Sequence, residues 1–125
     1  NGAKGGESPD SPDLEGGDLA RADVLGVLGR GIYIGNLHYL NYSDRTACRL
    51  TGMTRFASFW VEDGEIRAPL NVMRFDDSLF RVLGDHLEAL TATPELLIDN
   101  HTYDGRSTGS ARLPGALIRD FSFTL

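Results

Sequence analysis

The sequence is poor in cysteine, in long apolar runs and in basic residues. Cys48 is its only cysteine, which excludes an internal disulfide and favours a reducing compartment, so we expect a cytoplasmic protein. No apolar stretch is long enough to cross a bilayer. The amino end is polar and begins with Asn1, so we expect no signal peptide. The 12 basic and 18 acidic residues give a net charge of -6. We therefore expect neither a membrane nor a directly bound nucleic acid as partner.

The sequence also lacks the common metal-binding and catalytic motifs. Its three histidines, His38, His86 and His101, stand far apart, and none has a second histidine three to five residues away. A dispersed three-histidine zinc site stays an alternative, but we expect structural roles for these side chains. Cys48 would need a neighbouring base or cation to act as a nucleophile. Arg45 and Arg49 are close to it in sequence, but a histidine could come near only through folding. We expect an inert thiol in a turn.

The remaining acidic residues and glycines give no stronger indication of a site. Glu62 and Asp63 belong to a predicted turn, where polar residues are common. A polar loop between Asp99 and Asp104 lacks the residue spacing of a calcium-binding loop. No glycine-rich stretch has the preceding strand and the following lysine that a phosphate-binding loop requires. We expect all of these residues to be structural.

The chain divides into a polar beginning and one modest domain. Residues 1–17 consist mainly of glycine, proline, serine and acids, so we predict a disordered linker that cannot bury enough apolar surface to fold. Residues 18–125 are long enough to build one small core, and their apolar content is ordinary for a globular domain.

The middle of the chain is typical of a β-hairpin. The run Phe59-Trp60-Val61 favours a strand, and the pair Asp63-Gly64 favours a tight left-handed turn. After the turn, apolar and polar residues alternate until Val72, where the phase of the alternation changes. We predict strands over 50–61 and 65–75, with a β-bulge where the phase changes.

The other elements are predicted from capping residues and periodicity. They are a helix that Asp18 caps and that ends near residue 29, a strand over 32–42, a short helix that Asp76 or Asp77 caps and that ends near residue 84, a strand over 87–90, and a final strand at the carboxyl end. The fold class is β-rich α+β: five or six strands in a mainly antiparallel curved sheet, half-barrel or sandwich-like, with two short helices.

Six aromatic residues are expected to lie mainly in the core, although they could also line a surface that binds a peptide or a partner. They are Tyr33, Tyr39, Tyr42, Phe56, Phe59 and Trp60.

The residue identities in several segments, and not only the pattern of apolar and polar residues, resemble the C-terminal domain of the TldD/PmbA peptidase family. The resemblance covers roughly residues 18–124. It depends on the order of several segments, which are Gly31-Ile32-Tyr33-Ile34, Asn41-Tyr42-Ser43-Asp44-Arg45-Thr46, Thr51-Gly52-Met53-Thr54-Arg55, Glu62-Asp63-Gly64-Glu65-Ile66, residues 71–80 and the final run from Leu113 to Thr124.

The resemblance implies a role in a cytosolic metallopeptidase complex that acts on unfolded or small peptides. In such a heterodimer one subunit supplies zinc, and its partner helps to shape an enclosed chamber. The implied partners are a TldD-type metal-binding subunit, the chain's own N-terminal domain and a peptide substrate. The family also carries the label modulator of DNA gyrase, but the charges of this chain do not support direct contact with DNA.

The resemblance also implies where metal ligands would be found in the metal-binding branch. Those members carry a His-Glu-x-x-x-His helix and a cysteine in a late loop, and neither is present in this sequence. The loop that matches, 99–106, has His101 instead, which is a candidate ligand because imidazole also binds zinc. We expect a PmbA-type (TldE-type) subunit with no catalytic residue and no cofactor of its own.

A second interpretation belongs to a different functional class. The chain would then be a stand-alone β-rich module that binds peptides or proteins through the hairpin and the 99–112 loop, without any peptidase role. A long domain encoded before Asn1 would favour the first interpretation, and its absence would favour the second.

Overall fold

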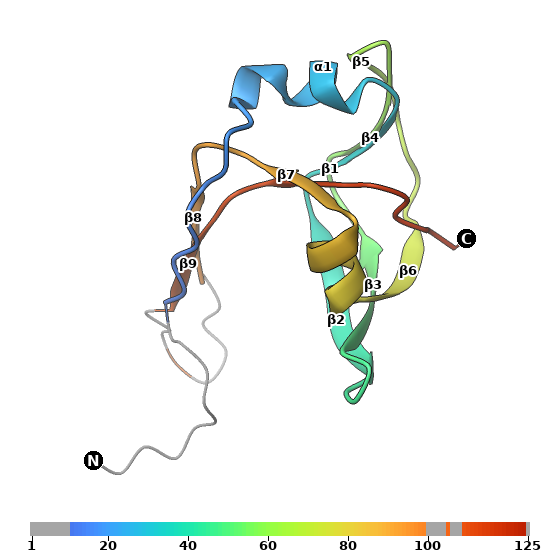
Figure 1. Cartoon of the computed structure of the whole chain (residues 1–125). Helices are drawn as coiled ribbons and strands as arrows, with labels where there is room; N and C mark the ends of the chain where they lie inside the picture. Colours follow the sequence, from blue (N-terminus) through green and yellow to red (C-terminus); the bar gives the residue numbers. More distant parts are fainter. Residues whose placement is uncertain (1–10, 100–104, 106–108, 125) are drawn as a thin grey trace.

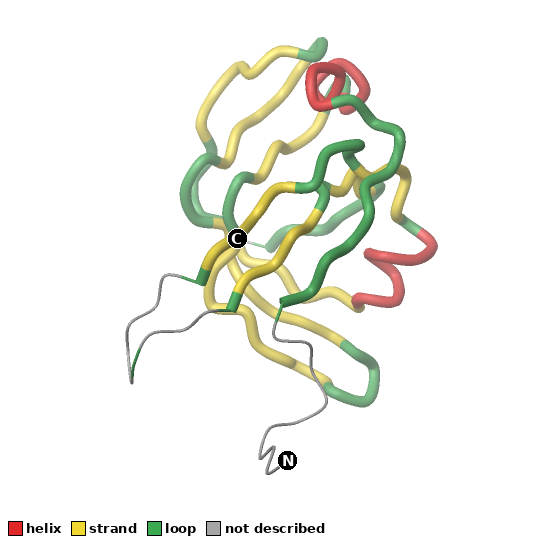
Figure 2. The backbone as a smooth tube through the Cα atoms, turned by 90° about the vertical axis from the view of Figure 1, so that its left-hand side faces the viewer, coloured by secondary structure: helices red, strands yellow, loops and turns green. Residues whose placement is uncertain are grey.

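The computed structural model of the chain describes residues 11–99, 105 and 109–124. In this part of the chain, ten short strands form four small antiparallel sheets, and helices are confined to two places (Figures 1 and 2). The predicted β-rich α+β class is confirmed. The strands are shorter and more numerous than the five or six expected, because several predicted strands are broken in the middle.

The first sheet contains the predicted hairpin turn. Its strands are β1 (Gly31–Ile34), β4 (Ser58–Glu62) and β5 (Glu65–Pro69), in the order β1-β4-β5. Asp63 and Gly64 connect β4 to β5 with φ values of 55° and 72°. Two consecutive positive φ values are the geometry that an Asp-Gly pair favours in a tight hairpin. The tight Asp63-Gly64 turn is therefore confirmed.

The second sheet corrects the predicted strand boundaries. Its strands are β2 (Leu37–Asp44), β3 (Arg49–Thr54) and β6 (Arg74–Ser78), in the order β2-β3-β6. The predicted strand 50–61 is thus divided between two sheets, and so are the predicted strands 65–75 and 32–42. The change of phase after Val72 marks the passage from one sheet to the other, while the irregularity of the hairpin lies at Trp60 and Val61.

The chain changes sheets where Gly35 meets Ala57. The Gly35 N–H donates to the Ala57 carbonyl over 2.8 Å, and a side chain at position 35 would lie 2.9 Å from the Ala57 Cβ. Ala57 itself has a φ of 51°, in the left-handed region. At this contact β1 gives way to β2 and β3 gives way to β4. Sequence periodicity alone does not reveal these breaks.

Two further pairs of strands carry the rest of the chain. They are β7 (Leu87–Leu90) with β10 (Ala116–Ile118), and β8 (Glu95–Ile98) with β9 (Ser110–Leu113). In Figure 1, β8 and β9 stand at one side of the molecule and β2, β3 and β6 at the other, with β7 crossing between them. The predicted strand 87–90 is confirmed. The predicted final strand is reduced to β10 and an isolated bridge between Arg74 and Thr124.

The segment before the first helix lies along these strands. Leu14 N–H donates to Arg112 O over 2.9 Å, and Gly17 N–H donates to Thr91 O over 3.0 Å. At Gly16 a Cβ atom would lie only 2.3 Å from the Ala92 carbonyl oxygen, so the close approach requires glycine. Residues 12–17 therefore belong to the folded part, which corrects the linker prediction for them. The prediction for residues 1–10 lies outside the described residues.

The helices are short and begin later than predicted. They are η1 (Arg21–Asp23), which continues into α1 (Val24–Leu28), and η2 (Arg81–Asp85). Asp18 caps neither, because the strand-like segment continues through Leu19, which bridges to Thr91. Asp76 and Asp77 lie inside β6 and not at a helix N-terminus, so both predicted caps are wrong.

The core of the described residues is small. Val61 and Phe75 are the apolar residues that are almost completely buried. The Phe75 ring packs against Phe121 edge-on, with ring centroids 5.3 Å apart, and Phe123 completes the cluster. Tyr39, Tyr42 and Phe56 are at least half exposed, so the prediction that they lie in the core is wrong.

Candidate functional site

Among the strands that the structure describes, β8 is the most exposed apolar one. Leu96, Leu97 and Ile98 have exposed fractions of 62%, 54% and 70%. Successive side chains of a strand point to opposite faces, so both faces of β8 present apolar groups. In the described part of the chain, β9 is the only strand that pairs with β8. Residues 12–14 extend this sheet on the β9 side through hydrogen bonds to Arg112, so β8 is its edge strand in the described part of the chain.

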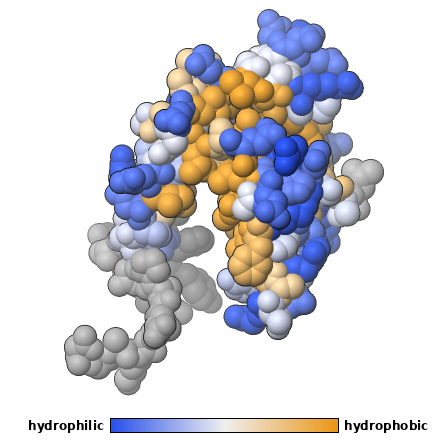
Figure 3. Space-filling model, in the orientation of Figure 1, coloured by the Kyte–Doolittle hydropathy of each residue, from blue (hydrophilic) through white to orange (hydrophobic). Residues whose placement is uncertain are grey.

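A hollow separates β8 and β9 from the rest of the molecule. In Figure 3 apolar residues gather around this hollow, while the outer faces are mostly hydrophilic. Additional half-exposed apolar residues lie on β2 and on η2, among them Leu40, Tyr42 and Leu83. Contiguous exposed apolar surface is found at sites where proteins contact other proteins, membranes or ligands. We call Leu96, Leu97 and Ile98 the β8 surface.

The strongest polar cluster lies on β3 and β6. The Arg49 side chain donates from Nε to Oδ1 of Asp76 over 2.8 Å and also to the Asp76 carbonyl over 3.0 Å. The hydrogen bond from Ser43, and then that from Arg49, hold the pKa of Asp76 below its ordinary value of 3.8. Because three segments meet through one carboxylate, the cluster fixes the β2-β3-β6 sheet and offers no free base.

A second ion pair fastens η2. Asp77, which is 8% exposed, accepts a hydrogen bond from Nη1 of Arg81, and Nη2 of Arg81 donates to the Asp120 carbonyl. The pair thus connects β6, η2 and the segment after β10. The Asp77 carboxylate and the Arg81 guanidinium are hydrogen-bonded within the chain, so we interpret the pair as structural.

The histidines lie on different elements. His38 is in β2, where its ring lies 4.3 Å from the Tyr39 ring. His86 follows η2, and its Nδ1 is 2.9 Å from the Arg119 carbonyl oxygen. His101, the candidate ligand, lies outside the described residues. Among residues 11–99, 105 and 109–124, no group of three or more His, Cys, Asp or Glu could hold a metal ion.

Cys48 lies in the turn between β2 and β3. It is half-buried and has a φ of 48°, while its carbonyl accepts a hydrogen bond from the Leu79 N–H over 2.9 Å. Asp44 supports the same turn, because its Oδ1 accepts hydrogen bonds from the Thr46 and Ala47 N–H groups. The predicted position of the thiol in a turn is confirmed; its inertness stays a prediction.

What the sequence did not reveal is the exposure of the apolar strand. Leu96, Leu97 and Ile98 form an uninterrupted apolar run, which usually indicates a strand covered on both faces. The apolar run could thus have indicated a strand that is buried on both faces. In the described part of the chain, however, Leu96, Leu97 and Ile98 are exposed. No helix in this part of the chain has the length and apolarity that a bilayer crossing requires.

Comparison with known proteins supplies the family context for this arrangement. The family model described as the PmbA/TldA metallopeptidase C-terminal domain matches residues 6–125, a longer stretch than the residues 18–124 that carry the resemblance. No curated protein matches the chain.

Proposed function

The chain belongs to the PmbA/TldD metallopeptidase family as its C-terminal domain, and from this premise we propose that it serves as a docking scaffold in a cytoplasmic peptidase complex. In this proposal the chain is part of a PmbA-type (TldE-type) subunit. Its partners are a TldD-type subunit, which binds zinc, and its own N-terminal domain. The complex acts on unfolded or small peptides.

The observation that carries the proposal is the exposed apolar surface on β8. Burial of Leu96, Leu97 and Ile98 against a partner would stabilise the complex by about 25 cal/mol for each Å² of apolar area removed from water. The adjoining hollow is bordered by apolar residues on the facing elements (Figure 3). A scaffold that completes its core only when another domain or subunit docks would present such a surface.

The proposed division of labour assigns the chemistry to the partner subunit. The polar clusters of this chain, around Asp76 and around Asp77, are closed by arginines. Arg49 connects β3 to β6, and Arg81 connects η2 to β6. These clusters support the β2-β3-β6 sheet, which lies on the other side of the hollow from the β8 surface. In the proposal, this chain holds no catalytic residue and no cofactor, and zinc is bound by the partner.

The proposal is tested by the location of zinc in the purified proteins. The full-length protein that contains this domain is prepared alone and together with a family member that carries His-Glu-x-x-x-His. Zinc is measured for each protein, the masses are determined in solution, and hydrolysis of an unfolded peptide is recorded. We expect a complex, with zinc and hydrolysis present only when the second protein is included.

Stoichiometric zinc and peptide hydrolysis by the protein alone would contradict the proposal. The variant His101→Ala is included as a control for the candidate ligand. If zinc is retained by the complex of this variant, the ligands lie elsewhere, as the proposal states. Loss of the zinc on this substitution would assign the metal to this chain instead.

A further inference from the structure

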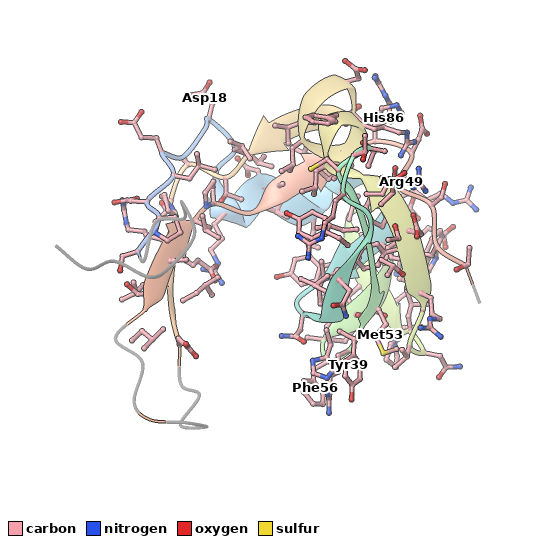
Figure 4. All side chains as sticks on the ribbon, turned by 90° about the horizontal axis from the view of Figure 1, so that it is seen from below. Asp18, Tyr39, Arg49, Met53, Phe56 and His86 are labelled. Atoms are coloured by element: carbon pink, nitrogen blue, oxygen red, sulfur yellow. The ribbon has the colours of Figure 1, made fainter. Side chains whose placement is uncertain are left out.

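An aromatic patch lies at one end of the β2-β3-β6 sheet, on different strands from the β8 surface. We define it by Tyr39, Met53, Arg55, Phe56 and Arg74. Met53 pairs with Arg74 on β6 and with His38, the residue before Tyr39, on β2. Arg55 and Phe56 follow β3, and the Arg55 N–H donates to the β1–β2 connection. Figure 4 shows Tyr39, Met53 and Phe56 at the same edge of the sheet.

The two aromatic rings of the patch are displayed to solvent. Tyr39 is 69% exposed and Phe56 is 68% exposed. Tyrosine, methionine and arginine are enriched where proteins contact one another, and aromatic residues dominate the energy of such contacts. Neither ring contributes to the small core of the domain, so stability alone does not explain two large aromatic side chains here.

The backbone beneath the patch is held in a conformation that ordinary residues avoid. Tyr39 has a φ of 52°, and the pairing of β2 with β3 shifts its register just after His38. Ala57, which follows Phe56, has a φ of 51°. Left-handed backbone at non-glycine residues costs free energy and clusters at functional sites. The bulge in β2 sets the position of the Tyr39 side chain.

The charge of the patch is positive, in a chain whose net charge is negative. The Arg55 guanidinium lies over the Phe56 ring, 5.1 Å from its centroid. Arg55 and Arg74 are both exposed, and neither forms an ion pair with another described residue. The stretches that build this edge, 36–41, 52–57 and 70–75, contain no aspartate or glutamate.

We propose that the aromatic patch is a docking site for a protein segment that presents an aromatic or large apolar side chain beside a carboxylate. The apolar side chain packs against Tyr39 and Phe56, and the carboxylate pairs with the guanidinium of Arg55 or Arg74. Guanidinium groups bind carboxylates with two parallel hydrogen bonds, which gives this pairing its geometry. The inference does not depend on the proposed peptidase complex.

Single-stranded nucleic acid is the other ligand that aromatic rings and arginines can bind. The chain as a whole is acidic, with a net charge of -6. A nucleic acid needs a track of cations along its backbone, whereas this edge offers two. A peptide with one carboxylate matches these two guanidinium groups better than a nucleic-acid strand with many phosphates does.

The test compares the binding of two end-capped, fluorescent peptides to the full chain. Their sequences are Gly-Ser-Phe-Asp-Ser-Gly and Gly-Ser-Phe-Asn-Ser-Gly, and single-stranded oligo(dT) is the third probe. Fluorescence anisotropy measures the affinity of each. We expect the aspartate peptide to bind roughly ten-fold more tightly than the asparagine peptide, and more tightly than oligo(dT).

Variants assign the binding to the patch. Phe56→Ser should abolish binding of both peptides, and Arg55→Gln should reduce the preference for aspartate. Leu96→Ser, on the β8 surface, should change neither the affinity for the two peptides nor the preference for aspartate. Circular dichroism shows whether each variant retains its fold, which is expected because the three side chains are exposed. Equal affinity for the two peptides, no binding at about 1 mM, or tighter binding of oligo(dT) would overturn the proposal.

Discussion

Thr54 and Met73 are joined by two hydrogen bonds at the end of β3. The Thr54 N–H donates to the Met73 carbonyl over 2.9 Å, and the Met73 N–H donates to Oγ1 of Thr54 over 3.0 Å. Thr54 is completely buried, so water cannot replace a lost partner. This pair holds the entry to β6 against β3, and therefore supports the edge of the sheet that carries the aromatic patch.

Replacement of the Thr54 hydroxyl should destabilise the domain. Thr54→Val keeps the shape of the side chain but leaves the Met73 N–H without its acceptor, which should cost about 1–3 kcal/mol. Urea unfolding followed by the fluorescence of Trp60 measures the change. Thr54→Ser, which keeps the hydroxyl, is the control and should retain more of the stability. A valine variant at least as stable as the serine variant would show that the hydrogen bond contributes little.

Glycine at position 48 should stabilise the turn between β2 and β3. Cys48 has a φ of 48°, a conformation that costs an ordinary residue about 1–2 kcal/mol and costs glycine nothing sterically. Cys48→Gly should therefore unfold at a higher urea concentration than Cys48→Ala, which keeps a Cβ atom. The opposite order would mean that the turn relaxes in the alanine variant and that the backbone is not strained there.

Acid should weaken the β2-β3-β6 sheet through Asp76. The hydrogen bonds from Ser43 and Arg49 lower the pKa of Asp76 in the folded state. A carboxylate with a lowered pKa contributes stability above its unfolded pKa, and this contribution is lost as the pH falls through the folded pKa. Asp76→Asn should therefore be less stable than the original chain at neutral pH. The difference should shrink as the pH falls below 3.8 and should vanish only below the lowered pKa of the folded state.

The measurement for Asp76 is the urea midpoint as a function of pH. Asp18→Asn, at an exposed position before the first helix, is the control and should leave the profile unchanged. A constant difference between Asp76→Asn and the original chain at every pH would attribute the loss to packing and not to the charge.

A charge on the β8 surface should prevent docking. Leu97→Glu would place a carboxylate where the proposed partner covers an apolar side chain, and burial of an unpaired charge is very unfavourable. In the full-length protein we expect the affinity for the zinc-binding subunit to fall roughly a hundred-fold or more. Val27→Glu on α1 is a matched control, because Val27 and Leu97 are both 54% exposed. Equal loss in both variants would exclude a specific role for β8.

Local chemistry explains which parts of the fold could be predicted. The Asp63-Gly64 turn requires two positive φ values, and few other residue pairs accept them, so its position was clear from two residues. The strand Leu87–Leu90 was likewise visible in its apolar residues. These elements depend on neighbours in the sequence.

Tertiary contacts explain what could not be predicted. The predicted strands 32–42 and 50–61 break where Gly35 and Ala57 meet, and the predicted strand 65–75 breaks between β5 and β6. The strand-like course of residues 12–17 depends on hydrogen bonds to Thr91 and Arg112. Exposure is equally non-local: the aromatic residues Tyr39 and Phe56 have the composition of a core but lie at a sheet edge. Composition alone therefore left both interpretations, core and binding surface, open for the aromatic residues, and the fold decides between them.

The central claim is that this domain frames an active centre without supplying a reactive group. It is tested most directly by the kcat of the reconstituted complex for an unfolded peptide, measured with four single variants of this chain. They are His38→Ala, Cys48→Ser, His86→Gln and His101→Ala. We predict a kcat within about two-fold of the unsubstituted complex for each, because a group that takes no part in the transition state leaves kcat unchanged. A loss of about a hundred-fold or more in a variant that still folds and still binds its partner would contradict the claim.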